Sequence, residues 1–343
     1  MLTIQQAIDR IHGGADLARE ESADAAAAIL QEEMQDSVVA EFLVALAEKG
    51  ETGDEIAGFA SVLMNHAARV DASEGCVDLC GTGGSGRPRF NVSTAAAFVV
   101  SACGVPVAKH GNRGSRQPNG SFDLLEALEL PLEMAAQQAS DCLESMDLAF
   151  LYARQYHPIM KNVVAARKLA ARRTIFNLVG PLCNPAKIGF QVIGTSDPVL
   201  MRSLGDALKS LGRIRSLVVC GDPGIDEISI SGATRMLEIR PESMISSTIS
   251  PDELGIMCVP YEEIPAGPAA FNAAIFRALL ANEAADSTRD MVALNAGAAL
   301  YVCGHCLTLR DGYLEARESI ADGRVKAKFD EYKAYADSHH IRG

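Results

Sequence analysis

Four glycines within six residues form a loop whose composition suits an anion. They are Gly81, Gly83, Gly84 and Gly86. Glycine lets the backbone approach an anion with no Cβ in the way. The spacing satisfies G-x-G-x-x-G, but a dinucleotide-binding loop turns directly into a helix and is followed about 20 residues later by an acidic residue. Pro88 intervenes and no Asp or Glu lies near residue 101. A Walker A Gly-Lys-Ser/Thr is also missing, so phosphate or pyrophosphate is the simpler prediction.

The helix predicted next would direct its amino end at the same anion. The run "NVSTAAAFVV" predicts a helix with Ser93 as its N-cap. Free amides and the positive end of the helix dipole would then face the loop. Arg87 and Arg89 add positive charge. The alternative is a structural turn before an ordinary capped helix.

Polar side chains are dense between the predicted strand ending near residue 110 and the helix after it. They are Lys109, His110, Asn112, Arg113, Ser115, Arg116 and Ser121. A loop at the carboxyl end of a strand is where α/β sheets bind ligands. These donors suit a phosphorylated sugar, and the alternative is a solvated surface loop.

Two further segments carry charges that could meet a substrate. His157 and Pro158 precede a predicted basic helix holding Lys161, Arg167, Lys168, Arg172 and Arg173. Most of these would be solvated, but one arginine facing inward could bind a carboxylate bidentately. Asp226 and Glu227 follow another predicted strand. Adjacent carboxylates are often only solvated, yet beside a phosphate site they become candidate magnesium ligands.

An α/β fold is predicted to position these segments. Residues 1–72 are predicted to be helical, with capping boxes at 3–6 and 52–55. From about residue 75, short β-like runs alternate with helices, which favours a largely parallel sheet. The runs are "GCVDLC", "VPVAKH", "QVIGT" and "SLVVCG". We predict an α/β fold: a small helical domain, 1–72, with a returning helical segment near 160–185, and an α/β domain, 73–343, with a mostly parallel central sheet.

Composition excludes several classes. The net charge of −13 argues against nucleic acid as a partner. No run of about 18 apolar residues appears, which argues against a membrane span, and the amino end has no signal-peptide pattern. Nine cysteines scattered through apolar runs indicate reduced thiols and a cytoplasmic location. The pair in "CGHC", Cys303 and Cys306, is interpreted as two thiols on a buried helix, with a redox or metal motif as the alternative.

Taken together, the motifs resemble those of the anthranilate phosphoribosyltransferase family. The matching pieces are "CGTGGSG", "NVST", "KHGNR", "GSFDLLEAL", "HPIMKNV", "RTIFNLVGPLCNP" and "GIDEIS". Each is weak alone, but the ordered set across residues 75–230 is specific. The resemblance implies a nucleoside phosphorylase/phosphoribosyltransferase-like fold, a homodimer formed through the helical domain, and a magnesium requirement. The reaction would join anthranilate to phosphoribosyl pyrophosphate in tryptophan biosynthesis.

The resemblance also implies roles for single residues. Pyrophosphate-binding positions correspond to Gly81, Gly84, Asn91, Ser93 and Thr94, and further sugar-phosphate contacts to Lys109 and Ser121. Metal ligands correspond to Ser93, Asp226 and Glu227 and would hold Mg²⁺. Anthranilate contacts correspond to Asn112 and Arg167, with His110 and His157 lining the same side. His110 would help to position the acceptor.

Four positions depart from the family pattern. Where this chain has Ser85, the family usually has Asp, and where it has Arg89, the family usually has Thr. Two serines usually stand in the places of Arg116 and Gln117. All four belong to the phosphoribosyl side, where they raise the local positive charge. Three other functions stay open on this evidence: a diverged paralogue using another aromatic amine, a pyrimidine nucleoside phosphorylase, and a non-catalytic nucleic-acid-binding relative.

Overall fold

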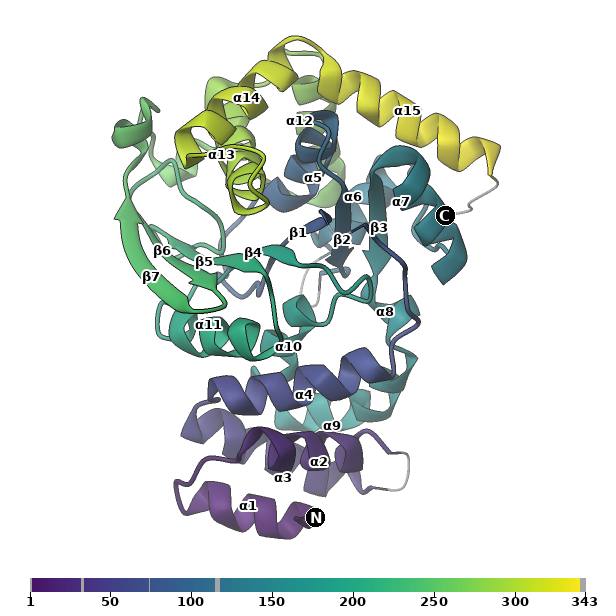
Figure 1. Ribbon diagram of the computed structural model, residues 1–343, viewed down its shortest axis with the longest axis vertical. Helices are drawn as coiled ribbons and strands as arrows, with labels where there is room; N and C mark the ends of the chain where they lie inside the picture. Colours follow the sequence, from purple (N-terminus) through teal and green to yellow (C-terminus); the bar gives the residue numbers. More distant parts are fainter. Residues whose placement is uncertain (1, 32–33, 74, 115–117, 340–343) are drawn as a thin grey trace.

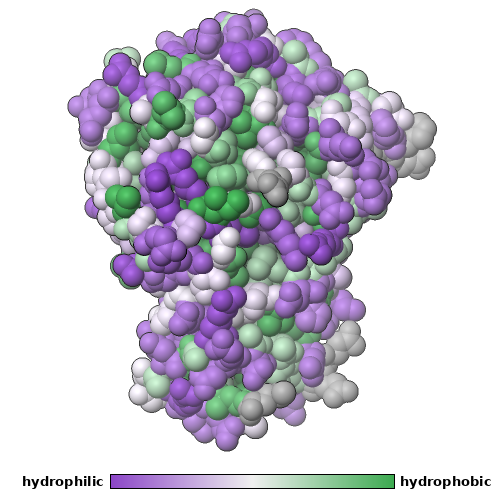
Figure 2. All heavy atoms as spheres, in the orientation of Figure 1, coloured by the Kyte–Doolittle hydropathy of each residue, from purple (hydrophilic) through white to green (hydrophobic). Residues whose placement is uncertain are grey.

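The computed structural model describes residues 2–31, 34–73, 75–114 and 118–339. Helices from the beginning of the chain form a narrow bundle at one end, and a wider α/β body forms the other (Figure 1). The same narrowing is visible in the space-filling view (Figure 2). No helix in these ranges is long and apolar enough to cross a membrane.

The amino-terminal helices begin where the sequence predicts caps. They are α1 (Ile4–His12), α2 (Arg19–Ile29), α3 (Asp36–Lys49) and α4 (Gly53–Asn65). The Thr3 hydroxyl accepts a hydrogen bond from the Gln6 amide, and the Thr52 hydroxyl accepts one from the Glu55 amide, both at 3.3 Å. In each case the N3 side chain bonds back to the cap amide. Both predicted capping boxes are therefore confirmed.

The described residues form a seven-stranded sheet in the order β3-β2-β1-β4-β5-β6-β7. The strands are β1 (Val77–Gly81), β2 (Val107–Gly111), β3 (Leu148–Tyr152), β4 (Phe190–Gly194), β5 (Arg215–Gly221), β6 (Thr234–Arg240) and β7 (Ser243–Ile249). The first five are parallel, and β6 and β7 add an antiparallel hairpin at one edge. The predicted mostly parallel sheet is confirmed, and the four predicted β-like runs are β1, β2, β4 and β5.

Helices connect the strands and cover the sheet. The α-helices are α5 (Val92–Ala102), α6 (Ser121–Ala127), α7 (Ala136–Met146), α8 (Ala153–Tyr156), α9 (Val164–Ala170), α10 (Phe176–Leu182), α11 (Leu200–Ser210), α12 (Ala269–Leu280), α13 (Asp286–Val302), α14 (Leu309–Ala321) and α15 (Arg324–Ser338). Short 3₁₀ helices are η1 (Pro158–Val163), η2 (Pro251–Leu254) and η3 (Tyr261–Glu263). The predicted basic helix is interrupted: η1 precedes α9, and α9 ends before Ala171, whose φ of 50° is left-handed, so Arg172 and Arg173 lie beyond it.

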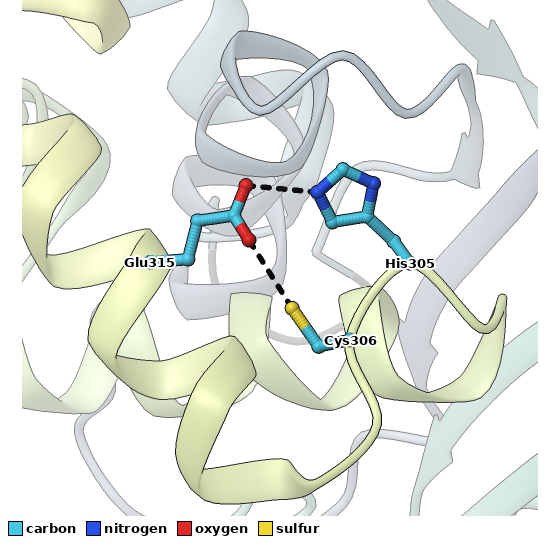
Figure 3. Close-up of side chains that lie close together, drawn as sticks. All are labelled: His305, Cys306 and Glu315. Atoms are coloured by element: carbon cyan, nitrogen blue, oxygen red, sulfur yellow. Dashed lines mark hydrogen bonds and ion pairs between the residues drawn. The ribbon is translucent and has the colours of Figure 1, made fainter.

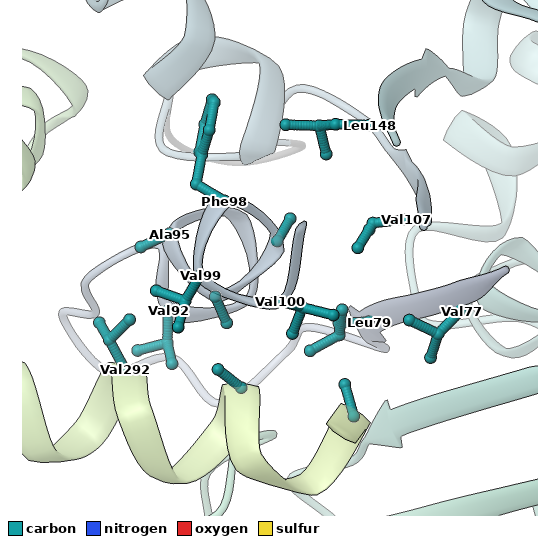
Figure 4. Close-up of a cluster of buried hydrophobic side chains, with 14 of the residues drawn as sticks. Val77, Leu79, Val92, Ala95, Phe98, Val99, Val100, Val107, Leu148 and Val292 are labelled. Carbon is teal, nitrogen blue, oxygen red and sulfur yellow. The ribbon is translucent and has the colours of Figure 1, made fainter. Parts of the chain in front are cut away.

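The two faces of the sheet belong to two hydrophobic cores. Successive strand side chains point to opposite faces, so Val192 lies in one core and its neighbour Ile193 in the other. The first core packs α5 against β1, β2 and α13, as Figure 4 shows, and the Phe98 ring of α5 packs against Phe150 of β3 with centroids 5.2 Å apart. Both helices are apolar on nearly all sides because they are enclosed.

The second core joins the bundle to the sheet. It contains side chains of α1–α4, α9, α10 and α11 together with Val218 of β5 and Ile239 of β6. Helices α10 and α11 lie between the sheet and the bundle (Figure 1). We propose to divide the chain at about residue 72, with η1, α9 and α10 counted with the bundle, although one continuous core crosses that division.

Candidate functional site

The glycine loop begins at the point where the sheet topology reverses. From β1 the chain passes to β2 and β3 on one side and then returns across β1 to β4. Open α/β sheets bind ligands at such a point, outside the carboxyl ends of the strands. Asp226 packs on both carboxyl ends: a Cβ at Gly81 of β1 or at Gly194 of β4 would overlap it. Both strands therefore end in glycine because the Asp226 segment lies against their backbones.

Asp226 organises the loop through its carboxylate. Its Oδ2 accepts a hydrogen bond from the Gly83 amide at 2.8 Å. The Arg89 guanidinium donates to both carboxylate oxygens at 3.2 Å. Asp226 is buried, whereas the Arg89 side chain is one-third exposed. Asp226, which the sequence predicts as a metal ligand, is thus paired with Arg89, one of the four residues that depart from the family pattern.

The loop needs glycine for conformation as well as for space. Gly83, Gly84 and Gly86 have φ values of 69°, 90° and 68°, in the left-handed region. Among the described residues, the Gly84 and Gly86 amides have no acceptor. These two exposed amides remain open to an anion, while the Gly83 amide is used by Asp226. Ser85 lies between them, and its hydroxyl accepts from the Arg87 amide at 3.4 Å.

Helix α5 starts two residues earlier than predicted. Its N-cap is Asn91, so the prediction of Ser93 as N-cap is wrong. The Asn91 side chain makes no capping bond; its Nδ2 donates to the carbonyls of Asn119 and Gly120 at 3.2 Å. Ser93 therefore lies in the first turn, where its amide has no acceptor among the described residues, and the buried Thr94 hydroxyl is also without a partner.

The carboxylate pair has the electrostatics of a cation site. Burial and the neighbouring Asp226 charge raise the pKa of Glu227 to about 8, despite the opposing Arg89 and Lys109. Two adjacent carboxyls that cannot both ionise easily gain from a divalent cation, and magnesium takes one or two carboxylates plus substrate oxygens. Asp226, Glu227 and the Ser93 hydroxyl are donors of the kind that Mg²⁺ prefers. The residues fit the ion, with Arg89 occupying the accessible side of Asp226.

Lys109 lies deeper than the sequence suggested. It is almost completely buried, and its Nζ donates to the Leu79 carbonyl of β1 at 2.7 Å. Nearby Asp78 is fully buried, and it accepts from the His110 amide and from Asn184. Burial raises the pKa of Asp78, and the Lys109 charge opposes that rise. Lys109 thus compensates a buried carboxyl beneath the loops. Sequence reasoning overlooked Asp78, although a charge inside "CVDLC" was a visible signal.

Two histidines meet at the other side of the site. The ring centroids of His110 and His157 are 5.3 Å apart, and both residues are buried. His157 Nε2 bonds to the Cys183 carbonyl at 2.8 Å, while His157 Nδ1 and His110 Nε2 have no hydrogen-bond partner among the described residues. Burial lowers the pKa of both rings, and for His110 the neighbouring His157 adds to the effect. Burial thus favours the neutral form of both rings, and each ring keeps one nitrogen without a partner in the described part of the chain.

Arg167 is the arginine that the sequence analysis matched to the acceptor carboxylate. It is half-buried on α9 and lies over the Phe176 ring of α10, 5.4 Å from its centroid. Burial lowers its pKa. Within the described ranges no acidic side chain pairs with it. By contrast, Arg172 beyond the helix binds Glu48 on the surface.

Other predicted residues occupy the rim. Asn112 is exposed, and its Oδ1 accepts from the Arg113 amide at 2.8 Å. Ser121 begins α6 and lies against Gly111 at the end of β2. Arg113 is directed to Glu126 and Asp123, so it serves the loop itself. Ser115, Arg116 and Gln117 lie outside the described residues.

Sequence reasoning missed an asparagine cluster that fixes the loop. The Asn272 side chain donates to Asn91 Oδ1, to Asn119 Oδ1 and to the Arg89 carbonyl at 2.9–3.0 Å. Asn119 Nδ2 also donates to the Arg89 carbonyl, at 3.0 Å. Tyr261 adds a bond to the Pro88 carbonyl at 2.8 Å. Three distant segments therefore meet on the backbone of residues 88–89, and nothing local in the sequence signals it.

Away from this site, His305 and Cys306 of the turn between α13 and α14 meet Glu315 of α14. His305 and Cys306 each contact one oxygen of Glu315, at 2.8 and 3.2 Å (Figure 3). Cys303 is the C-cap of α13 and Cys306 lies beyond it, so the interpretation of "CGHC" as two thiols on a helix is wrong. The glycine after Cys303, with φ of 80°, ends the helix there. The three side chains satisfy one another's hydrogen bonds.

Comparison with known proteins agrees with the geometry. The chain matches a glycosyl transferase family, its helical bundle domain over residues 5–67 and its a/b domain over residues 73–326. Anthranilate phosphoribosyltransferase of Sphingopyxis alaskensis is 42% identical over 93% of this chain and 96% of its own length. The enzyme of Rubrobacter xylanophilus is 38% identical over 96% of both chains.

Solved structures show the same fold. Anthranilate phosphoribosyltransferase from Thermus thermophilus has a TM-score of 0.90 at 37% identity and covers 96% of this chain and 98% of its own. The Saccharomyces cerevisiae enzyme, solved in complex with PRPP and Mg, has a TM-score of 0.88 at 23% identity over 98% of both chains. The family match over most of the chain and the full-length identities lead to one conclusion: the chain belongs to the anthranilate phosphoribosyltransferase family.

Proposed function

We propose that this chain transfers the phosphoribosyl group of phosphoribosyl pyrophosphate to the amine of anthranilate. The products are N-(5-phosphoribosyl)anthranilate and pyrophosphate, and the step belongs to tryptophan biosynthesis. The enzyme is a pentosyltransferase. The observation that carries the assignment to this site is Arg167, a half-buried guanidinium with no acidic partner in the described structure. Such a group is matched by a substrate carboxylate.

We propose that the phosphoribosyl pyrophosphate binds over the carboxyl ends of β1 and β4. The open amides of Gly84 and Gly86, the first turn of α5 at Ser93 and Thr94, and the Arg89 side chain support this placement. Amides at a helix amino end stabilise negative charge without having to reorganise. Ser121 at the start of α6 offers a further hydroxyl for the sugar phosphate.

The acceptor would lie on the side of α9 and α10. The Arg167 guanidinium would bind the anthranilate carboxylate, and the neutral His110–His157 pair would line the ring and amine. Asn112 would add an amide at the rim. The amine is a free nucleophile at neutral pH, so it needs placement near the anomeric carbon more than removal of a proton. A neutral His110 Nε2 can accept a hydrogen bond from that amine, which orients its lone pair.

The reaction builds negative charge on the departing pyrophosphate and positive charge on the ribose. Backbone amides of the loop and of the first turn of α5 stabilise the negative charge on the pyrophosphate. Magnesium bound by Asp226, Glu227 and Ser93 would supply further charge stabilisation on the leaving oxygens. The neutral histidines leave the acceptor side without a competing positive charge. No covalent enzyme intermediate is required.

We also propose a homodimer formed through the bundle. Two apolar side chains on α9, Val164 and Leu169, are 47% and 61% exposed. Helix α9 packs on α3, so the exposed pair lies on the outer surface of the bundle. Leu169→Glu should halve the mass measured by light scattering, whereas an equal change at the exposed Val199 before α11 should not.

The nine free cysteines support a reducing, cytoplasmic location.

The assay that tests the function follows the fluorescence of anthranilate. Its loss should require phosphoribosyl pyrophosphate and Mg²⁺ and should match pyrophosphate release one to one. Other aromatic amines tested in parallel should react more slowly. Faster turnover of another amine would identify a diverged paralogue, cleavage of thymidine with phosphate would identify a nucleoside phosphorylase, and a nucleic-acid gel shift without turnover would identify a non-catalytic relative. Any of these three results overturns the proposal.

A further inference from the structure

Arg89 lies where a cation bound to Asp226 would lie. The Asp226 side chain is only 4% exposed. One oxygen accepts from the Gly83 amide, and both oxygens accept from Arg89 Nη1. The strand ends at Gly81 and Gly194 close the inner side. The exposed part of the Arg89 side chain therefore covers the approach from solvent to this carboxylate.

The backbone of Arg89 is fixed, so only its side chain can move. The Arg89 carbonyl accepts from Asn119 Nδ2 and from Asn272 Nδ2, at 3.0 and 2.9 Å. The preceding carbonyl, of Pro88, accepts from the Tyr261 hydroxyl. Arg87 in the same loop has a different partner: its guanidinium lies over the Tyr261 ring, 5.8 Å from the centroid. Of the two arginines, only Arg89 contacts Asp226 among the described contacts.

We propose that Arg89 is a built-in cation that holds Asp226 in the free protein and must leave it before a divalent metal binds there. The proposal rests on the proposed function, because phosphoribosyl pyrophosphate supplies the second partner for the guanidinium. A phosphate oxygen binds arginine at least as well as a carboxylate does. Arriving substrate would draw Arg89 away and free Asp226, so metal and substrate would bind cooperatively and each would raise the affinity for the other. Threonine, the usual residue of the family here, has no charge with which to do this.

The direct test measures metal binding without substrate. Mn²⁺, a spectroscopic substitute for Mg²⁺, is titrated into wild type and Arg89→Thr, and free Mn²⁺ is followed by electron paramagnetic resonance. Arg89→Thr should bind Mn²⁺ about tenfold more tightly or better, since a hydrogen bond between charged groups contributes on that order. At saturating pyrophosphate, wild type and Arg89→Thr should have similar affinities for Mn²⁺, because the wild-type guanidinium then has another anion to bind.

Arg87→Thr is the matched control, since it removes the same charge from the same loop without touching Asp226. It should tighten Mn²⁺ binding far less than Arg89→Thr does. Equal tightening by both variants would show a general charge effect and overturn the proposal. In an Asp226→Asn background, Arg89→Thr should have no further effect on Mn²⁺ affinity, and an undiminished effect there would also overturn it.

Two controls separate the metal-binding result from effects on folding and on turnover. If Arg89→Thr lowers the melting temperature, Arg89→Gln, which keeps the length and a hydrogen-bond donor, should still tighten Mn²⁺ binding. No anthranilate is present in the titrations, so the metal result stands or fails regardless of turnover. Failure of the proposed function appears instead as absent anthranilate consumption by wild type.

Discussion

Replacing Arg167 by methionine should separate substrate binding from stability. In the folded protein the Arg167 guanidinium lies over the Phe176 ring, and it pairs with no acidic side chain of the described residues. A bidentate arginine–carboxylate contact contributes about 1.5–3 kcal/mol, so its loss should raise the anthranilate KM about 10- to 150-fold. Phosphoribosyl pyrophosphate is proposed to bind elsewhere, over β1 and β4, so its KM should change less than about twofold.

The same change should hardly affect folding. The lost cation–π contact costs about 0.5–1 kcal/mol. Against this, burial lowers the pKa of Arg167, which means that the charge is held in the folded state at a cost that methionine removes. The two effects oppose each other, and methionine still covers Phe176. The melting temperature should therefore shift by no more than about 3 °C in either direction.

Steady-state kinetics with each substrate varied in turn, together with a thermal melt, measures all three quantities. Lys168→Met on the exposed side of the same helix is the control, and it should leave both KM values and the melting temperature unchanged. An equal rise in both KM values for Arg167→Met would place Arg167 outside the acceptor site. An unchanged anthranilate KM would refute the reasoning from the unpaired guanidinium altogether.

Two further changes test the packing and electrostatics under the loop. Gly194→Ala places a Cβ onto the Asp226 backbone and should cost more than about 3 kcal/mol in denaturant unfolding, whereas Gly180→Ala, with open space around it, should cost nothing; equal effects would contradict the close approach. Glu227→Gln should stabilise the metal-free protein at pH 8.5 by about 2 kcal/mol, a value reduced for partial exposure. The pKa of Glu227 is raised from 4.5 to about 8, so the stability that this one group contributes is fully present below pH 4.5 and is lost as pH rises through 8. The gain should vanish near pH 4.5, and a gain that is the same at both pH values would contradict the raised pKa.

The sequence predicted the strands whose composition is distinctive and missed those whose composition is not. The strands β1, β2, β4 and β5 are short apolar runs that end at glycine or the site loops. The β3 run "LAFLY" has no β-branched residue, and a short continuous apolar run cannot be told from buried helix by periodicity. The β6–β7 hairpin lies at the sheet edge, where β7 is mostly exposed and its composition is polar.

The site was predictable as a set of segments but not as a set of contacts. Local capping preference favoured Ser93, whereas Asn91 became the N-cap because Asn272 and the 119–120 backbone hold its side chain. Lys109 was predicted to contact the sugar phosphate, and the structure adds a role that was not predicted: it lies under the loop and compensates Asp78. Each difference has one physical origin: a partner more than 25 residues away decides where a side chain points, and no local pattern carries that information.

Arg89 and Asp226 are far apart in the sequence, and their contact changes how the departures from the family pattern should be understood. An extra positive charge near the pyrophosphate would be expected simply to tighten substrate binding. The structure shows that this charge is already paired in the free protein, so part of its attraction for phosphate is offset by leaving Asp226. Only the part of the interaction that grows as the pyrophosphate departs can raise kcat. Arg89→Thr should therefore lower kcat while tightening metal binding, and a rise in both would mean that Arg89 only competes with the metal and gives nothing to the transition state.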